Sequence, residues 1–248
     1  MPQRRAYNRF IYSRDEGEIM PIYNAPLTAI DTMETKRYAG LKNARFDDAK
    51  IASAADEAAL LATPRGIWQQ YAYDSSRSCV LSDPPFPIIG RSIQKHLDRC
   101  EAVIILAATV GEGIEKHVTE SFDAGNYAYA VLLDAAATAA VEQVADAMER
   151  TIRPSVDRAG YTMRWRYSPG YGDWPLSEQP HLIRLSHAAE IGIRLTESLM
   201  LWPRKSITAI IGLAKKTTNM PAVPPSGCAS CAKLDCPSRR LPPAVSSS

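Results

Sequence analysis

The segment from Tyr127 to Ile152 restricts the fold more than any other part of the chain. Its apolar residues recur every three or four positions, at Ala130, Leu133, Ala137, Val141, Val144, Met148 and Ile152. This period places them on one face of a helix, so the segment predicts a long helix packed against a core. Pro154 is expected to end the helix, because proline lacks a backbone N–H and its ring clashes with the preceding turn.

Shorter patterned runs precede this helix. Residues 47–61 have the helical period, and a second helical pattern extends from 89 to 100 after a proline-rich stretch. The apolar run 102–108 predicts a buried strand. The run 109–118 contains two glycines and predicts the start of a further helix.

The segment 162–168, TMRWRYS, changes to a period of two. On a strand, Trp165 and Tyr167 would face one side, which we expect to be core, and Arg166 would face the other. Arg166 would then stand at the end of a strand, directly before the turn Pro-Gly-Tyr-Gly at 169–172.

The part of the chain after this turn predicts one helix and two strands. Residues 180–190 have a helical pattern, with Gly192 as a cap beyond the end. Segments 192–203 and 206–213 read as strands joined by Pro203–Lys205. Helices concentrate early and strands late, without the regular alternation of βαβ units, so we expect an α+β fold.

Composition excludes several classes of protein. The chain of 248 residues has 29 basic and 27 acidic side chains, a formal net charge of +2. Nucleic-acid binding usually needs a one-sided basic surface, so we expect no nucleic-acid partner. No apolar run approaches the roughly 18 residues of a membrane span, and the N-terminal sequence has no secretory apolar region. We therefore expect a cytoplasmic protein with no membrane partner.

The chain divides into three parts by composition. Residues 1–34, rich in Arg, Tyr and Pro, have no clear period and predict an N-terminal arm. Residues 35–218 predict a single domain. Residues 219–248, rich in Pro and Ser, predict a tail.

Three cysteines lie close together in the predicted tail, at Cys228, Cys231 and Cys236. In a reducing compartment such a cluster indicates metal binding before disulfides. Thiolates are favoured ligands of zinc and of iron–sulfur clusters. A fourth ligand would be Cys79, Cys100, a histidine, a partner's residue or an exogenous group. The alternative is three exposed thiols in a tail.

Two motifs together resemble the activation (reactivation) domain of cobalamin-dependent methionine synthase. Arg166, Gly170 and Tyr171 match an Arg-x-x-x-Gly-Tyr motif, and Leu195–Ser198 followed by Trp202–Pro203 match a downstream Leu-Thr-Glu-Ser and Trp-Pro. The resemblance extends over roughly 125–215. It implies an α+β domain with a mixed or antiparallel twisted sheet and packed helices, here as a free-standing relative with a cysteine tail.

The resemblance also implies a ligand, S-adenosylmethionine. Arg166 would bind its carboxylate, since a guanidinium binds a carboxylate through two parallel, charge-assisted hydrogen bonds. Gly170 and Gly172 would let the backbone approach the ligand. The ring of Tyr171 would lie near a cation. Without the resemblance, the same Arg-Tyr pair around a Pro-Gly turn would be read as a simple turn.

An acidic residue on the preceding helix binds the ligand's ammonium in this family. Glu142 is our candidate for that role, with Asp146 and Glu149 as alternatives. Glu142 is equally interpretable as a solvated charge on the helix surface. Glu197 and Ser198 are expected to cap a turn or to pair with Lys205.

No catalytic side chain is predicted. The sequence shows no Ser-His-Asp order, and the Gly-x-Gly at 111–113 lacks the third glycine of a dinucleotide site. Methyl transfer from a sulfonium to reduced cobalamin needs no general base. The resemblance therefore implies reductive methylation of the cobalamin of a separate methionine synthase or other corrinoid protein, with an electron donor as a further candidate partner. The alternative is a non-catalytic metal- or S-adenosylmethionine-binding accessory protein.

Overall fold

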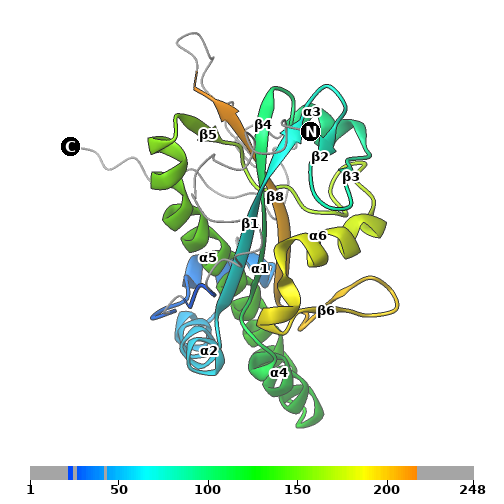
Figure 1. The fold of residues 1–248 in the computed structure, drawn as a ribbon. Coiled ribbons are helices and arrows are strands. Elements are labelled where there is room, and N and C mark those ends of the chain that lie inside the picture. The colour runs from blue at the N-terminus through cyan, green and yellow to red at the C-terminus, as the bar shows by residue number, and fades with distance from the viewer. Residues whose placement is uncertain (1–21, 25–26, 42–43, 217–248) are drawn as a thin grey trace, which may run out of the picture.

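Three long antiparallel strands form the centre of the molecule in the computed structural model, which describes residues 22–24, 27–41 and 44–216. They are β1 (Arg65–Asp74), β4 (Cys100–Thr109) and β8 (Ser206–Lys215), with β4 in the middle (Figure 1). The strand β4 contains the predicted run 102–108 and is buried on both faces. An uninterrupted apolar run, without alternation, is typical of a strand covered on both sides.

Short strands complete the sheet in the order β3-β2-β1-β4-β8-β5. They are β2 (Cys79–Val80), β3 (Phe86–Pro87) and β5 (Tyr161–Met163). A separate pair consists of β6 (Arg194–Leu195) and β7 (Leu201–Trp202). All the paired strands are antiparallel. The predicted α+β class with an antiparallel sheet is confirmed.

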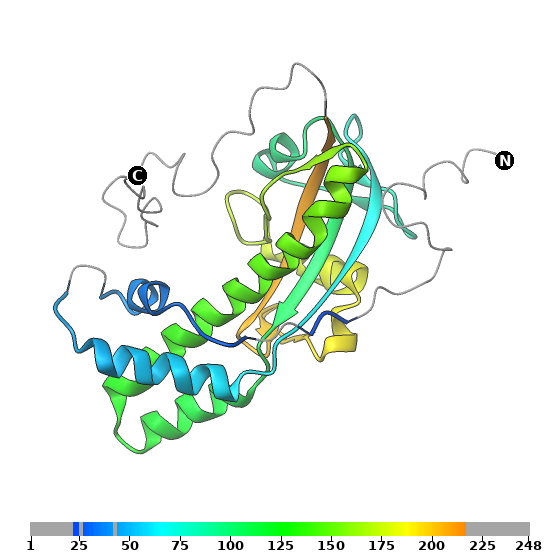
Figure 2. The same ribbon diagram turned by 90° about the vertical axis from the view of Figure 1, so that its left-hand side faces the viewer.

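One long helix, α5 (Tyr127–Arg158), covers one face of the sheet (Figure 2). Half of its 14 buried residues are alanine, which lets the helix backbone approach its neighbours closely. The expected stop at Pro154 is wrong, because the helix continues to Arg158. Pro154 removes only one backbone hydrogen bond near the end, and the complete burial of Val156 holds the last turn against the sheet.

The helix α5 is long and apolar enough to cross a membrane by length and composition alone. However, 61% of its most apolar stretch is buried inside the protein. It is therefore the core helix of this fold.

Three helices pack around the N-terminal half of α5 (Figure 2). They are α1 (Thr32–Tyr38), α2 (Asp48–Leu61) and α4 (Gly113–Asp123). The helices predicted in 47–61 and after 109 are confirmed as α2 and α4. Asp47 caps α2 by accepting from the backbone N–H of Ala49 at 3.0 Å.

The described residues that precede position 35 contact the domain. Tyr23 pairs with Gly66 through two backbone hydrogen bonds of 2.7 and 2.8 Å. Ile30 is buried, and Asp31 caps α1 while its N–H donates to Gln143 on α5 at 2.8 Å. The division into arm, domain and tail stays a prediction.

The other face of the sheet is covered by α3 (Arg91–His96), α6 (Gln179–Ser186) and the bend before α6. The helix predicted over 180–190 is present as α6 and a short 3-10 turn, and Gly192 ends it with a left-handed φ of 81°. Strand β1, rich in aromatic residues, was not predicted. Its GIWQQYAY sequence has the composition that would have indicated a strand.

The strand predicted over 162–168 is shorter than expected. Only Tyr161–Met163 pair regularly with β8, and Tyr167 returns to it as an isolated bridge to Ile210. Trp165 therefore lies outside the core with 38% of its surface exposed, whereas Tyr167 is 7% exposed. The expectation of a continuous core face is wrong for Trp165, because the chain leaves the sheet around it.

Candidate functional site

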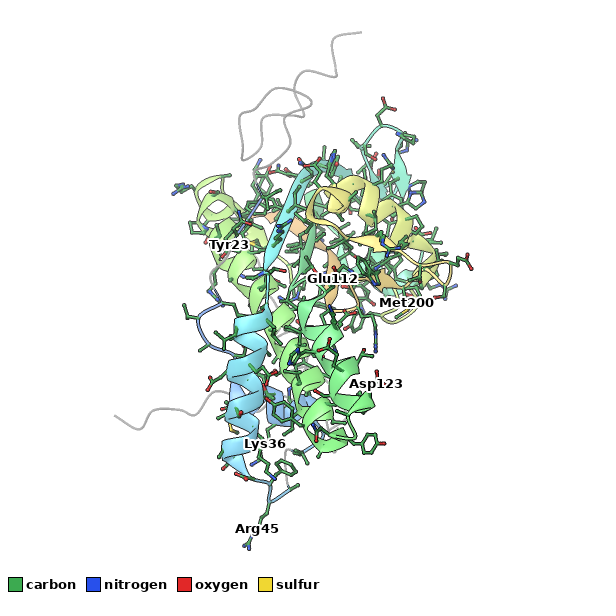
Figure 3. The ribbon with its side chains drawn as sticks, turned by 90° about the horizontal axis from the view of Figure 1, so that it is seen from below. Tyr23, Lys36, Arg45, Glu112, Asp123 and Met200 are labelled. Carbon is green, nitrogen blue, oxygen red and sulfur yellow. The ribbon has the colours of Figure 1, made fainter. Side chains whose placement is uncertain are left out.

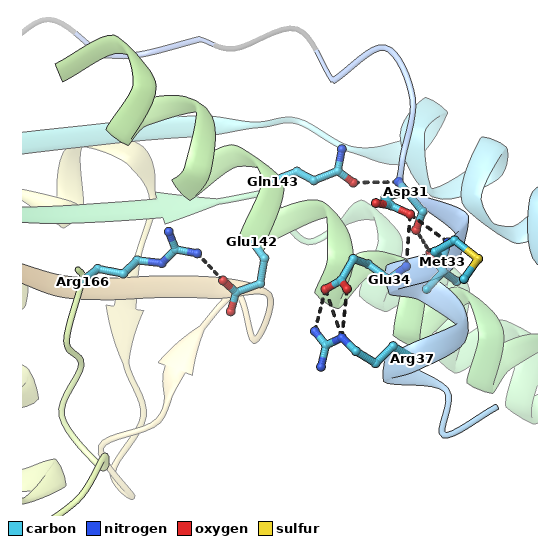
Figure 4. Close-up of polar contacts among 8 residues, drawn as sticks. Asp31, Met33, Glu34, Arg37, Glu142, Gln143 and Arg166 are labelled. Atoms are coloured by element: carbon cyan, nitrogen blue, oxygen red, sulfur yellow. Dashed lines mark hydrogen bonds and ion pairs between the residues drawn. The ribbon is translucent and has the colours of Figure 1, made fainter. Parts of the chain in front are cut away.

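Arg166 lies between the sheet and α5, where it contacts three carboxylates. Its Nη1 lies 2.6 Å from Asp146 and 2.5 Å from Glu149. Its Nη2 lies 2.5 Å from Glu142, the contact drawn in Figure 4. The structure thus brings together the predicted guanidinium and all three candidate acids. It does not leave Arg166 unpaired.

The three acids meet because of their spacing on α5. Positions 142, 146 and 149 follow at four and three residues, so their side chains lie on one face of the helix. Asp134 and Thr138 continue the same face toward the N-terminus of α5. We call Asp134, Glu142, Asp146 and Glu149 the acidic stripe.

Electrostatics keep the Arg166 guanidinium charged. Burial lowers its pKa, but Asp146, Glu149 and Glu142 outweigh that effect and raise the pKa above its usual value. The Arg166 side chain is 17% exposed and Glu142 is 26% exposed. One guanidinium against three carboxylates leaves an excess of negative charge, so this site attracts cationic groups.

Lys205 lies at the other end of the acidic stripe. Its Nζ is 2.8 Å from Asp134 and donates to Thr138 Oγ1 at 2.9 Å. The predicted alternative of a pair between Glu197 and Lys205 is therefore wrong, since Lys205 is held by Asp134.

A groove of about 510 Å³ opens beside this end of α5. Its wall combines apolar and charged side chains from three helices and from Arg204. The lining residues are Tyr38, Ala39, Glu115, Val118, Thr119, Phe122, Val131, Asp134, Ala135, Thr138 and Arg204. The volume is within the range of ligand-binding clefts. The groove does not include residues of the bend at 169–172.

The bend after Arg166 is fixed by the protein itself. The N–H of Gly170 donates to Trp174 O at 2.8 Å, and Trp174 is 1% exposed. Asp173 accepts from the backbone N–H groups of Arg91 and Ser92 at 2.7 and 2.9 Å, which caps α3. The buried Trp174 and the cap by Asp173 therefore hold the bend against the rest of the protein.

The two glycines of the bend have different reasons to be glycine. Gly170 and Gly172 have positive φ values of 90° and 56°, which glycine adopts without a steric cost. A Cβ on Gly170 would meet only Leu176, at 3.8 Å. A Cβ on Gly172 would lie 2.5 Å from Tyr167 Oη and 2.7 Å from Ser92 Oγ. The space at Gly172 is thus occupied by neighbouring side chains of this chain.

Tyr171 carries the exposed ring of the bend. It is 63% exposed, and its ring lies edge-on to Tyr167 at 6.4 Å between centroids. Trp165 packs on His96 at 4.3 Å. Burial lowers the pKa of His96, which the contact with the Trp165 carbonyl only partly offsets. Tyr171 is the aromatic side chain of this group most open to a ligand.

The second motif forms a small hairpin instead of the continuous strand expected over 192–203. Thr196 closes the turn by accepting from the N–H of Met200 at 3.1 Å, and it contacts Ser198 at 3.0 Å. Ser198 therefore takes part in the turn, which agrees with the expectation that it caps a turn. Met200, labelled in Figure 3, is 56% exposed. Arg194 lies over the Trp202 ring at 4.1 Å.

Comparison with known proteins identifies the family. The model of the vitamin B12 dependent methionine synthase activation domain matches residues 27–220. The chain belongs to this family. A crystal structure of the MetH reactivation domain bound to AdoHcy matches with a TM-score of 0.54 and 14% identity, over 82% of this chain and 81% of that chain. At this identity the likeness establishes the fold alone. No curated protein sequence matches the chain.

The activation-domain match includes both motifs and the acidic stripe, but it ends before the cysteine cluster. Cys228, Cys231 and Cys236 lie outside the described residues. Within the described part of the chain, no group of three His, Cys, Asp or Glu side chains is placed to hold a metal ion. Cys79 and Cys100 are free thiols, and burial raises the pKa of Cys100 to about 11.

Sequence reasoning did not identify Lys205 as a partner of the acidic stripe. The signal was present, since Lys205 follows Trp202–Pro203 directly before an apolar strand. A lysine at that place must turn away from the core, and α5 supplies the acidic surface that it meets.

Proposed function

We propose that this protein binds S-adenosylmethionine and supports reductive methylation of the cobalamin of a corrinoid partner. The observation that carries the proposal is the convergence of Arg166 on Glu142, Asp146 and Glu149 within an activation-domain fold. The related MetH domain, crystallised with AdoHcy, is consistent with a ligand of this class.

The residues fit the amino-acid end of this ligand, which carries one carboxylate and one ammonium. Insertion between Arg166 and Glu142 would exchange one internal ion pair for two, carboxylate on guanidinium and ammonium on carboxylate. Asp146 and Glu149 would continue to hold Nη1 of Arg166. Glu142, at 26% exposed, is accessible for this exchange.

The bend would serve the rest of the ligand. Tyr171 offers an exposed ring face to a sulfonium, an interaction that contributes about 0.5–2 kcal/mol. Gly170 leaves open space beside the backbone. Bound S-adenosylmethionine supplies an activated methyl group, and the side chains of this chain only orient it and limit access of water. We assign no catalytic residue.

Calorimetric titration of S-adenosylmethionine tests the proposal. Arg166→Ala is expected to weaken binding at least about tenfold, from loss of charge-assisted hydrogen bonds. Arg194→Ala, at an arginine stacked on Trp202, is the matched control and should bind like wild type. Because Arg166→Ala leaves three carboxylates unpaired, thermal melting must accompany it. Glu142→Gln provides a second variant, expected to bind more weakly while folded. Equal affinities of wild type and both site variants would overturn the assignment.

The partner is proposed to be a cobalamin-dependent methionine synthase or another corrinoid protein in the cytoplasm. Incubation with a cobalamin-loaded partner, S-adenosylmethionine and a low-potential reductant should form methylcobalamin. Binding without methyl transfer would instead support the accessory, non-catalytic function.

The cysteines at 228, 231 and 236 are proposed to bind an iron–sulfur cluster or zinc. A cluster could pass an electron to cobalt, or a separate donor could do so. The visible spectrum of protein purified without oxygen distinguishes the metals, because a cluster absorbs and zinc does not. Absence of both metals would leave three thiols and end this part of the proposal.

A further inference from the structure

Two cations, one at the start of the first motif and one just after the second motif, contact the same face of α5. Arg166 stands at the start of the first motif and contacts Glu142, Asp146 and Glu149. Lys205 follows the second motif by two residues and contacts Asp134. Segments far apart in sequence therefore meet on one acidic stripe.

Lys205 is a fixed charge because its backbone is also held. Its N–H donates to Glu115 Oε1 on α4 at 2.7 Å, and its carbonyl accepts from the N–H of Val110 at 3.2 Å. Its side chain is 11% exposed. The backbone of Lys205 is thus held by α4 and by Val110, and its ammonium is held by Asp134 and Thr138 on α5.

The ammonium of Lys205 lies close to the proposed ligand site. Thr138, its hydrogen-bond partner, precedes Glu142 by one helical turn, about 6 Å along the axis. Four carboxylates of the stripe against Arg166 and Lys205 leave a net charge of −2. Glu115 and Arg204, which line the adjacent groove, offset each other.

We propose that Lys205 is a specificity-determining residue of the S-adenosylmethionine site. Its fixed ammonium offsets part of the acidic stripe and so sets how strongly the site prefers the cationic sulfonium over the neutral thioether left after methyl transfer. The inference rests on the proposed function.

The chemistry explains why this balance matters. When the methyl group passes to the partner's nucleophilic cobalt, the carbon–sulfur bond breaks and its electron pair stays on sulfur. The product, S-adenosylhomocysteine, has lost one positive charge. A net negative site therefore binds the donor more tightly than the product, and a cation beside it moderates the difference.

The ratio of affinities for S-adenosylmethionine and S-adenosylhomocysteine, measured by calorimetry, tests the inference. Lys205→Met should raise the ratio about threefold or more, because the loss of one positive charge near the ligand favours the cationic donor over the neutral product. Lys205→Arg, which keeps the charge, should leave the ratio unchanged. Asp134→Asn should lower it, since a negative charge is lost.

Lys216→Met is the matched control. Lys216 also joins β8 to α5, by a 2.8 Å pair with Asp157, but at the far end of the helix. Its loss should leave the ratio at the wild-type value. A purely structural function of Lys205 would change both affinities together and not their ratio.

The outcomes separate the two proposals. If wild type binds S-adenosylmethionine but Lys205→Met has the wild-type ratio, the inference is overturned and the proposed function stands. If wild type binds neither ligand, both are overturned. Should Lys205→Met fail to fold, an unchanged ratio in Asp134→Asn would overturn the inference by itself.

Discussion

The two motifs both contain a turn, Pro-Gly-Tyr-Gly in the first and Thr-Glu-Ser-Leu in the second, but these turns occupy very different surroundings. The bend at 168–174 ends in Trp174, which is 1% exposed, and Asp173 ties it to α3. The hairpin at 195–202 is closed mainly by hydrogen bonds among its own residues, and its tip is exposed. Turn chemistry alone therefore does not tell whether a turn is part of a rigid site. Contacts with other elements decide that.

Removing one tryptophan from the bend and one from the hairpin should give the largest difference in stability between the two regions. Trp174→Ala would leave a large cavity in the core on the α6 side of the sheet and should lower the free energy of unfolding by about 3–5 kcal/mol. Trp202→Ala, at a partly exposed ring under Arg194, should cost about 1–2 kcal/mol. Urea unfolding of both variants measures the difference. Equal losses would mean that the hairpin is as firmly packed as the bend.

Glycine-to-alanine substitutions should give a smaller difference in the free energy of unfolding, between a crowded glycine in the bend and an open one before the hairpin. Gly172→Ala adds a Cβ that clashes with Tyr167 Oη and Ser92 Oγ at a positive φ, so we expect a loss of about 2–4 kcal/mol. Gly192→Ala, with φ of 81° and open space, should lose only about 1 kcal/mol. Thermal melting of the two variants is the measurement. A milder effect at Gly172 than at Gly192 would contradict the packing described for the bend.

The anchor of the bend should depend on pH. Hydrogen bonds from the Ser92 side chain and from backbone N–H groups lower the pKa of Asp173 below its usual value of 3.8. A lowered folded-state pKa gives stability that is present above pH 4 and is lost as pH falls through the folded value.

Asp173→Asn tests this dependence. The melting temperature of wild type should exceed that of Asp173→Asn at pH 6, and the gap should close between pH 4 and pH 2. Glu197→Gln, an exposed acid on the hairpin, is the control and should follow the wild-type profile. A constant gap down to pH 2 would show that the Asp173 charge does not hold the bend.

Much of the fold was predictable because its signals are local. The apolar period of Tyr127–Ile152 and the uninterrupted run 102–108 identified α5 and β4, which form the centre of the core. The turn at 169–172 was evident from its proline and two glycines. Strand β1 was missed because Gln69 and Gln70 divide its apolar residues into two short groups, so it has neither a period of two nor an uninterrupted apolar run, although its aromatic composition favours a strand.

By itself, the sequence determined that α5 has one apolar face and that Arg166 stands directly before a turn, since side-chain periodicity and turn chemistry are properties of neighbouring residues. Only the tertiary structure decided that Glu142, Asp146 and Glu149 share Arg166, and that Lys205 pairs with Asp134 and not with Glu197. Ion-pair partners from distant segments depend on how a strand and a helix pack against each other. That arrangement is set by packing of the whole core, which no local pattern contains.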